Sequence, residues 1–168
     1  WPLTKNTPKS LLEVAGGVTL LEAQLAHAQA CGIEEVVLVV GYKAEQIEAK
    51  VRGATIPVRT IYNPFFDISN NLVSAWLARG EMDRELVLLN GDVVFHPKVL
   101  AGLLDSALTG DLHMVVDRKD SYDDDDMKVQ IDQGRILKVS KKLPPTECNG
   151  ESIGMIRFSP RGAGTLRS

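Results

Sequence analysis

The central segment of the chain reads Glu85-Leu86-Val87-Leu88-Leu89-Asn90-Gly91-Asp92-Val93-Val94-Phe95. The apolar run Leu86–Leu89 predicts a strand buried on both faces. The run ends at Asn90-Gly91, where the chain can turn sharply, and Asp92 follows. Because ligands of open α/β sheets bind beyond the carboxyl ends of the strands, Asp92 is a candidate ligand of a divalent cation. A loop aspartate that only caps the next helix would have the same spacing.

Upstream of this segment the sequence predicts a strand, a helix and a second strand. The continuous β-branched run in Glu35–Tyr42 is typical of a strand inside a parallel sheet. Lys43–Val51 predicts a short helix, and Ile56–Tyr62 the next strand. Two parallel strands joined by a helix form a right-handed crossover unit, so the pattern predicts an α/β fold.

Helix boundaries can be predicted from capping residues. Thr19-Leu20-Leu21-Glu22 is a capping box that begins a helix running to about Gln29, before Cys31-Gly32. Asn71 is expected to cap a helix over 72–82, in which Trp76 packs against the sheet. Pro97 is expected in the first turn of a helix that ends near Leu108.

The last third of the chain changes pattern. It predicts a strand over 112–117, a hairpin of 127–132 with 135–141 around Gln133-Gly134, and a last strand over 152–158. The tail Arg161-Gly162-Ala163-Gly164 is expected to be a loop. The whole chain thus predicts a mostly parallel sheet flanked by helices, with a β-hairpin excursion that covers the ligand cleft.

Composition excludes several classes of protein. The 168 residues, 44% of them hydrophobic, suit one domain with a substantial core. A formal net charge of −3 argues against a nucleic-acid surface, and no apolar run approaches the roughly 20 residues of a membrane span. Cys31 and Cys148 match no metal-site spacing and no disulfide framework. We therefore expect a cytoplasmic protein without nucleic-acid or membrane partners.

Three polar segments are candidates for ligand binding. Lys9, between Pro8 and an apolar run, could bind a phosphate or be a surface lysine. The loop from Asn63 to Asn71 is rich in amides, which can read the edge of a base but more commonly form turns and caps. Asp123-Asp124-Asp125-Asp126 lacks the ligand alternation, glycine and closing glutamate of a calcium loop, so a solvated acidic loop is favoured.

An ordered series of short motifs resembles the nucleotidyltransferases that activate sugar phosphates and alcohol phosphates with a nucleoside triphosphate. The likeness covers nearly the whole chain, and Asn63 to Ser74 is similar to the phosphocholine cytidylyltransferase branch in particular. The matching motifs are Pro2-Leu3-Thr4, Pro8-Lys9-Ser10-Leu11-Leu12-Glu13-Val14, Leu20-Leu21-Glu22-Ala23-Gln24-Leu25, Gly32-Ile33, Val39-Val40-Gly41-Tyr42, Asn90-Gly91-Asp92, Asp117-Arg118-Lys119, Asp126-Met127-Lys128-Val129 and Ile153-Gly154-Met155.

The resemblance implies a three-layer, Rossmann-like fold and a specific reaction. A phosphate oxygen of a small phosphorylated acceptor would attack the α-phosphorus of a nucleoside triphosphate, CTP in the first place, and expel pyrophosphate. Positioning and charge neutralisation dominate such transfers, so no covalent nucleophile is required. In this implied site Asp92 binds Mg²⁺ and Lys9 neutralises the phosphates, both as catalytic residues.

The resemblance also implies contacts to the two substrates. Asn63, Asn71, Ser74 and Gly91 would border the nucleotide. Lys142, near the end of the hairpin, would contact the phosphate of the acceptor, although a solvated surface lysine is an equal alternative. The sequence does not determine the acceptor, the nucleotide or the oligomeric state.

Two features of the family are missing from this chain, namely the Gly-rich turn after a first strand and a second metal-binding aspartate. We therefore expect residues 1–168 to be a single catalytic domain that lacks its first strand and its C-terminal end. An inactive nucleotide-sensing domain of the same fold is the alternative. A dinucleotide-dependent Rossmann enzyme is disfavoured because no Gly-x-Gly-x-x-Gly follows a strand.

Overall fold

A computed structural model describes residues 4–105 and 107–167 of the chain. Pro2 and Leu3 of the first matching motif therefore lie outside the described residues. The elements follow the predicted order closely. They are η2 (Lys9–Leu11), β1 (Glu13–Ala15), β2 (Val18–Thr19), α1 (Leu20–Ala30), β3 (Val36–Val40), α2 (Ala44–Val51), β4 (Val58–Tyr62), α3 (Asn71–Leu77), η3 (Arg79–Glu81), β5 (Leu86–Leu89), α4 (Pro97–Leu103), β6 (Leu112–Asp117), β7 (Lys128–Asp132), β8 (Arg135–Val139), η4 (Pro145–Glu147), β9 (Gly150–Phe158) and α5 (Pro160–Arg167).

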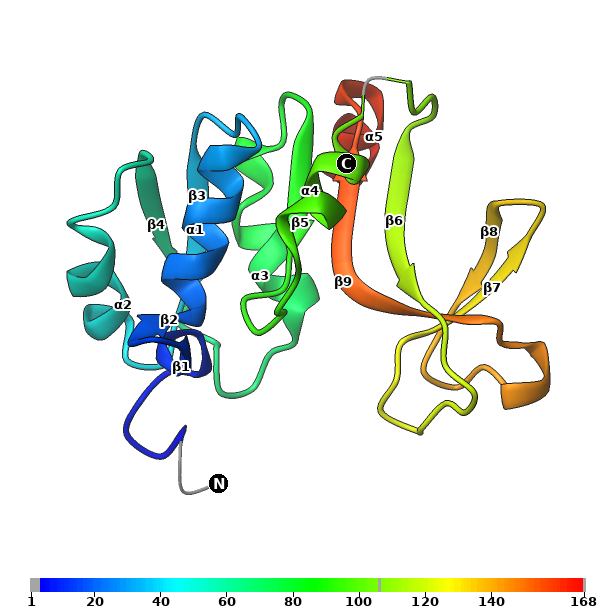
Figure 1. Cartoon of the computed structure of the whole chain (residues 1–168), viewed down its shortest axis with the longest axis horizontal. Coiled ribbons are helices and arrows are strands. Elements are labelled where there is room, and N and C mark those ends of the chain that lie inside the picture. The colour runs from blue at the N-terminus through cyan, green and yellow to red at the C-terminus, as the bar shows by residue number, and fades with distance from the viewer. Residues whose placement is uncertain (1–3, 106, 168) are drawn as a thin grey trace.

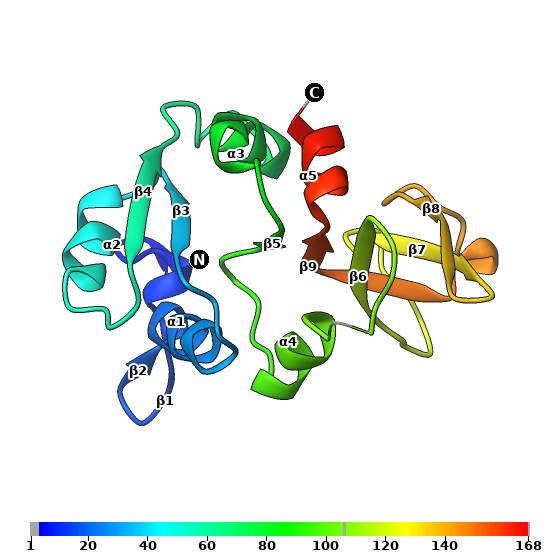
Figure 2. The same cartoon turned by 90° about the horizontal axis from the view of Figure 1, so that it is seen from above.

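The helices cover both sides of the strands, as a layered α/β fold requires. Figure 2 shows α1 and α4 on one side of β5 and β9, and α3 and α5 on the other. Buried side chains of α1 pack on β3 and β4, whereas those of α4 pack on β5 and β9 through Phe95 and Met155. The predicted α/β class is confirmed.

Strand pairing is more mixed than the sequence predicted. β3 and β4 are parallel, but β9 pairs antiparallel with β5, β6 and β7. β5 and β6 therefore run in the same direction on either side of β9. After the hairpin excursion the chain comes back as β9, and β9 is the antiparallel neighbour of β5, β6 and β7. In the described part of the chain β3 and β5 belong to separate hydrogen-bonded sheets.

The hairpin predicted around Gln133-Gly134 is confirmed. β7 pairs with β8, and Gln133 and Gly134 both have positive φ angles, of 47° and 78°, as a tight two-residue hairpin turn requires. In Figure 1 this hairpin projects to the right of β6 and β9, away from α1 and α2. Gly154 in β9, with φ of 76°, lies where the pairing of β9 with β6 shifts register.

The capping box at the start of α1 is present as predicted. The Thr19 hydroxyl accepts from Glu22 N, and the Glu22 carboxylate accepts from Thr19 N at 2.9 Å. Lys50 pairs with the same carboxylate at 2.7 Å. The hydrogen bond from Lys50, followed by those from Thr19, lowers the pKa of Glu22 to about 2.

Predictions for three helical segments are wrong. The helix after the amide loop ends at Leu77 and continues only as η3, and α4 ends at Leu103 rather than near Leu108. Trp76 is 57% exposed and stacks under the Arg79 guanidinium, 3.8 Å from the ring centroid, instead of packing on the sheet. The glycine-rich tail is part of α5, because Asp111 accepts hydrogen bonds from Ser159 and Arg161 and fixes the first turn of that helix.

No helix within 4–105 and 107–167 combines the length and the apolar character that crossing a bilayer requires. Cys31 and Cys148 are both free thiols.

Candidate functional site

The loop that follows β5 is anchored by neutral groups on two other elements. Asn90 N donates to Gly154 O of β9 at 2.8 Å. Gln24 Nε2, from a buried side chain of α1, donates to Val93 O at 2.8 Å and to Asn90 O at 3.4 Å. These bonds hold the backbone of Asn90–Val93 and leave its one carboxylate, Asp92, about half exposed (53%).

Lys9 and Asp92 lie together, although they are 83 positions apart in the sequence. Lys9 Nζ is 3.6 Å from Asp92 Oδ2, and the Lys9 side chain is 68% exposed. An ion pair this exposed contributes little to stability, so both charges remain available to a ligand. The apolar run after Lys9 suggests a buried strand, but η2 carries the lysine and the strand that follows, β1, is exposed.

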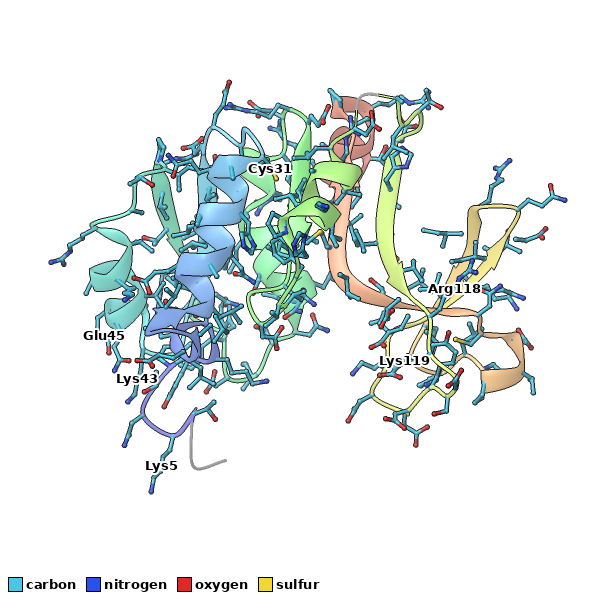
Figure 3. All side chains as sticks on the ribbon, in the orientation of Figure 1. Lys5, Cys31, Lys43, Glu45, Arg118 and Lys119 are labelled. Atoms are coloured by element: carbon cyan, nitrogen blue, oxygen red, sulfur yellow. The ribbon has the colours of Figure 1, made fainter. Side chains whose placement is uncertain are left out.

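The segment that carries Lys9 is tied to the end of β3. Tyr42 Oη donates to Lys5 O at 2.5 Å, and Lys43 Nζ donates to Asn6 O at 2.8 Å. Figure 3 shows Lys5 and Lys43 at the same end of the molecule. The turn after β3 therefore places the amino-terminal segment at the carboxyl ends of the strands, where a ligand of an α/β sheet is expected.

A pocket of about 110 Å³ opens next to the carboxyl ends of β3 and β4. Three predicted nucleotide-binding residues, Asn63, Asn71 and Ser74, line it. Phe66 forms part of the wall and contacts Gly41 so closely that a Cβ on Gly41 would lie 2.3 Å from Phe66 Cβ. The remaining lining residues are Val39, Val40, Ser69 and Asn70.

Asn63 organises this pocket from beneath. It is 3% exposed, its Nδ2 donates to Ser74 Oγ at 3.1 Å and to Ser69 Oγ at 3.2 Å, and its Oδ1 accepts from Phe65 N. Its amide is thus used within the protein, because it fixes the loop to the first turns of α3. Ser74 remains a pocket hydroxyl that can still donate its own proton.

Asn71 joins the pocket to the Asp92 loop. Its Nδ2 donates to Asn90 Oδ1 at 3.2 Å. The prediction that Asn71 caps α3 is wrong, since Asn70 Oδ1 accepts from Leu72 N and both the cap and the helix begin one residue earlier than predicted. The shift frees Asn71 to face Asn90. Sequence reasoning missed Asn90 as a site residue, although it stands directly before Gly91-Asp92.

Lys142 and Gly91 complete the set of predicted residues. Gly91 is exposed, and a Cβ there would meet no atom within 4 Å, so space for a ligand is open above its backbone. Lys142 is exposed in the turn after β8, and its backbone N donates to Ser140 Oγ at 3.1 Å. The structure records no contact between Lys142 and the Lys9–Asp92 pair within its described residues.

Metal ligands are sparse in this arrangement. Across the described part of the chain, no three His, Cys, Asp or Glu side chains gather to hold an ion. Asp92 is the carboxylate of the loop, and Mg²⁺ in nucleotide sites needs one or two carboxylates besides substrate phosphates and water. The donor chemistry of Asp92 therefore fits Mg²⁺ that arrives with a polyphosphate.

The acidic run contributes a structural pair rather than a purely solvated loop. Asp126 accepts from Asp123 N at 2.9 Å and from Lys119 Nζ at 3.2 Å, and Lys119 also pairs with Glu151. The Asp123 N–H, with the Lys119 ammonium, lowers the pKa of Asp126, while Glu151 and Asp126 raise the pKa of Lys119. Asp124 and Asp125 are exposed, as predicted.

The sequence of the chain is similar to those of known proteins. Residues 4–129 match the model of a protein family described as the MobA-like NTP transferase domain. The chain is 42% identical over 102 residues to CMP-5'-(3-aminopropyl)phosphonate synthase of Streptomyces rubellomurinus. The matched segment is 60% of this chain and 16% of that protein. It is 29% identical over 147 residues to choline-phosphate cytidylyltransferase of Streptococcus pneumoniae, with coverage of 81% and 61%. The chain thus spans less than two thirds of these relatives.

Solved structures share the fold. The inositol-1-phosphate CTP transferase of T. maritima superposes with a TM-score of 0.80 at 21% identity, over 97% of this chain and 66% of that one. The CTP:phosphocholine cytidylyltransferase of Streptococcus pneumoniae superposes with a TM-score of 0.68 at 18% identity, over 99% and 68%. At these identities the likeness establishes the architecture.

Proposed function

Since the chain belongs to the family of MobA-like NTP transferase domains, we propose that it transfers a cytidylyl group from CTP to a small phosphorylated acceptor and releases pyrophosphate. The observation that carries the proposal is the exposed Lys9–Asp92 pair, 3.6 Å apart beyond the end of β5. CTP is favoured because the names of similar proteins specify CTP or a cytidylyl product.

In this reaction an oxygen of the acceptor phosphate, or phosphonate, forms a bond to the α-phosphorus of CTP. The bond between the α-phosphorus and the bridging oxygen breaks, and that oxygen leaves with pyrophosphate. Negative charge accumulates on the phosphates in the transition state. The Lys9 ammonium can neutralise it as a point charge, and transfers of this kind depend chiefly on such positioning and electrostatics.

Asp92 would hold Mg²⁺ against the same phosphates. The ion, when bound, supplies Lewis-acid stabilisation of the phosphate oxygens. Within the chain itself, Gln24 and the backbone of Gly154 keep the loop of Asp92 in place, and Lys9 lies beside the carboxylate. A polyphosphate would therefore meet the Asp92 carboxylate with its cation and the exposed Lys9 ammonium at the same point.

The amide pocket would take the base end of the nucleotide. Its volume of about 110 Å³ is small beside the roughly 300–1,000 Å³ of pockets for whole ligands. It can therefore accommodate a flat ring and not the triphosphate, which would extend toward Asp92 along the Asn71–Asn90 contact. Ser74 and the amide of Asn71 would supply polar contacts, while Asn63 supports the pocket from inside.

Lys142 is proposed for the phosphate of the acceptor. It lies in the turn after β8, in the hairpin excursion. An acceptor that carries two negative charges requires cations, and Lys141 and Lys142 are exposed side by side in this turn. We also propose a cytoplasmic location, in keeping with two free thiols.

A nucleotide-sensing domain is the second candidate. One observation favours it: the described residues offer a single carboxylate at the proposed metal site rather than a set of three ligands. Such a domain would bind nucleotide in the same pocket without turnover.

Pyrophosphate release distinguishes the two functions. The purified protein is incubated with CTP, UTP, GTP, ATP or dTTP, each paired with phosphocholine, inositol 1-phosphate or 3-aminopropylphosphonate, in Mg²⁺ or in EDTA. We expect release with CTP, dependent on one acceptor and abolished by EDTA. Binding of a nucleotide in calorimetry without release in any pairing would establish the sensor instead. Release that is unaffected by EDTA would remove Mg²⁺ from the proposal.

A further inference from the structure

Lys128 is an ammonium buried in the hairpin excursion. It opens β7 and is 2% exposed, among the most deeply buried large side chains of the described residues. Its Nζ donates one hydrogen bond, to Lys141 O at 2.9 Å. In the part of the chain that the structure describes, no carboxylate lies within 4.0 Å of this ammonium.

The carboxylate nearest to Lys128 along the strand pairing is used by another lysine. Glu151 stands opposite Lys128 in the pairing of β7 with β9, but its carboxylate pairs with Lys119. Figure 3 places Lys119 at the base of the excursion, in the segment between β6 and β7. A buried charge without a counterion costs free energy that an apolar side chain of similar size would not. Stability therefore does not account for a lysine at position 128.

Lys128 holds one particular turn. Its carbonyl accepts from Ser140 N at 2.9 Å, so both its backbone and its ammonium bind the segment 140–143. Within that segment Leu143 N donates to Ser140 O, and the Leu143 side chain is 7% exposed. The turn is thus fixed from beneath, and the side chains that it presents to solvent are Lys141 and Lys142.

We propose that Lys128 is a positioning residue for the acceptor: its ammonium, through the carbonyl of Lys141, sets the turn that presents Lys142 to the phosphate. This inference rests on the role of Lys142 in the proposed function. The ammonium also adds positive potential beneath two surface lysines, which favours an anion above them and disfavours other ligands. Burial of Lys128 thus costs stability, and the protein keeps the residue because it contributes to binding of the acceptor.

The test compares Lys128→Met with Lys138→Met. Lys138 lies in the same hairpin but is 58% exposed and paired with Glu147, so its variant is a matched control. With CTP and each of phosphocholine, inositol 1-phosphate and 3-aminopropylphosphonate, we expect Lys128→Met to raise the KM of the acceptor about tenfold. The KM of CTP should not change, and the thermal midpoint should stay equal or rise because Met needs no desolvated charge. Lys138→Met should alter none of these values.

A double variant separates this inference from the proposed function. If Lys128 acts chiefly through the turn, adding Lys128→Met to Lys142→Met raises the acceptor KM much less than Lys128→Met raises it in the wild type. Additive effects would overturn the inference, as would a normal acceptor KM in Lys128→Met when Lys142→Met has raised it. A Lys128→Met protein that unfolds or melts several degrees lower would assign Lys128 to stability and also overturn it. A normal acceptor KM in Lys142→Met would instead refute the proposed role of Lys142.

Discussion

Two surface turns, Asn90–Val93 and Ser140–Leu143, present charged side chains on supports of opposite character. The first presents Asp92 and is held by neutral donors, Gln24 Nε2 and backbone amides. The second presents Lys142 and is held by the buried ammonium of Lys128. A cation buried under Asp92 would compete with Mg²⁺ for the carboxylate, whereas a cation under Lys142 strengthens attraction of a phosphate. The support beneath each turn therefore matches the charge of the ligand that we propose for it.

The largest expected effect tests the neutral-supported turn. Asp92→Asn keeps the shape and hydrogen bonds of the loop but removes the negative charge, so we expect kcat to fall about 10²–10³-fold. Pyrophosphate release at saturating CTP and Mg²⁺ measures it. Asp83→Asn is the control, because Asp83 is similarly exposed (57%) and pairs only with the adjacent Arg84 among the recorded ion pairs. Equal loss in both variants would refute a specific role for Asp92.

Lys9 is expected to matter less than Asp92, because it is exposed and Mg²⁺ would share the neutralisation of the phosphates. Lys9→Met should lower kcat about 10–100-fold and raise the KM of CTP, since one phosphate charge loses its partner. The acceptor KM should change little, in contrast to the effect of Lys128→Met. Steady-state kinetics with Lys98→Met, an exposed lysine of α4, as control separates these effects. An unchanged kcat would return Lys9 to a surface role.

Gly154 connects the two regions, because β9 pairs with β5 on one side of it and with β7 on the other. Its φ is 76°, and a Cβ there would lie 2.1 Å from Asn90 Nδ2. Gly154→Ala should therefore destabilise the protein by about 1–2 kcal/mol in urea unfolding. Gly102→Ala is the control with the opposite expectation. Gly102 is helical and surrounded by open space, so alanine should stabilise α4 by about 0.5–1 kcal/mol. Equal effects would refute the steric argument.

The smallest expected effect concerns pH and the ion pairs of the hairpin excursion. The pKa of Asp126 is lowered by the Asp123 N–H and by Lys119. The ionised carboxylate therefore stabilises the folded protein above pH about 4, and this stabilisation is lost as the pH falls through the folded-state pKa. Thermal midpoints of the wild type and Asp126→Asn should differ at pH about 6 and converge below pH about 4. Asp124→Asn, an exposed neighbour, should show no such convergence. A gap that is constant with pH would contradict the assignment.

Much of the candidate site could be predicted from the sequence, because short motifs mark the ends of strands. Asp92 follows an apolar run and Lys9 follows Pro8, and the structure brings the two within 3.6 Å. Asn63, Asn71 and Ser74, each predicted to contact the nucleotide, line one pocket. Their individual roles could not be predicted. Asn63 is buried beneath the pocket, and a one-residue shift makes Asn70 rather than Asn71 the helix cap.

No local sequence pattern marks the residues that support the site. Gln24 is a polar residue on a helix whose apolar positions recur at ordinary helical spacing, yet its amide donates a hydrogen bond to Val93 O, 69 residues away. Asn71 and Asn90 are 19 residues apart when they meet. Lys128 reads as a polar residue at the start of a hairpin strand, and only its 2% exposure shows that its charge is buried.

The sequence by itself determined the capping box of α1, the crossover from β3 to β4, the hairpin turn at Gln133-Gly134 and the carboxylate after β5. Each of these features depends on residues within a few positions of one another. Their backbone preferences and spacing favour the same local structure whatever the rest of the fold. Only the tertiary structure decided that Asn63 supports a pocket, that α5 forms on Asp111 and that Lys128 is buried under Lys141. These outcomes depend on hydrogen bonds and desolvation between segments distant in the chain, which no local pattern encodes.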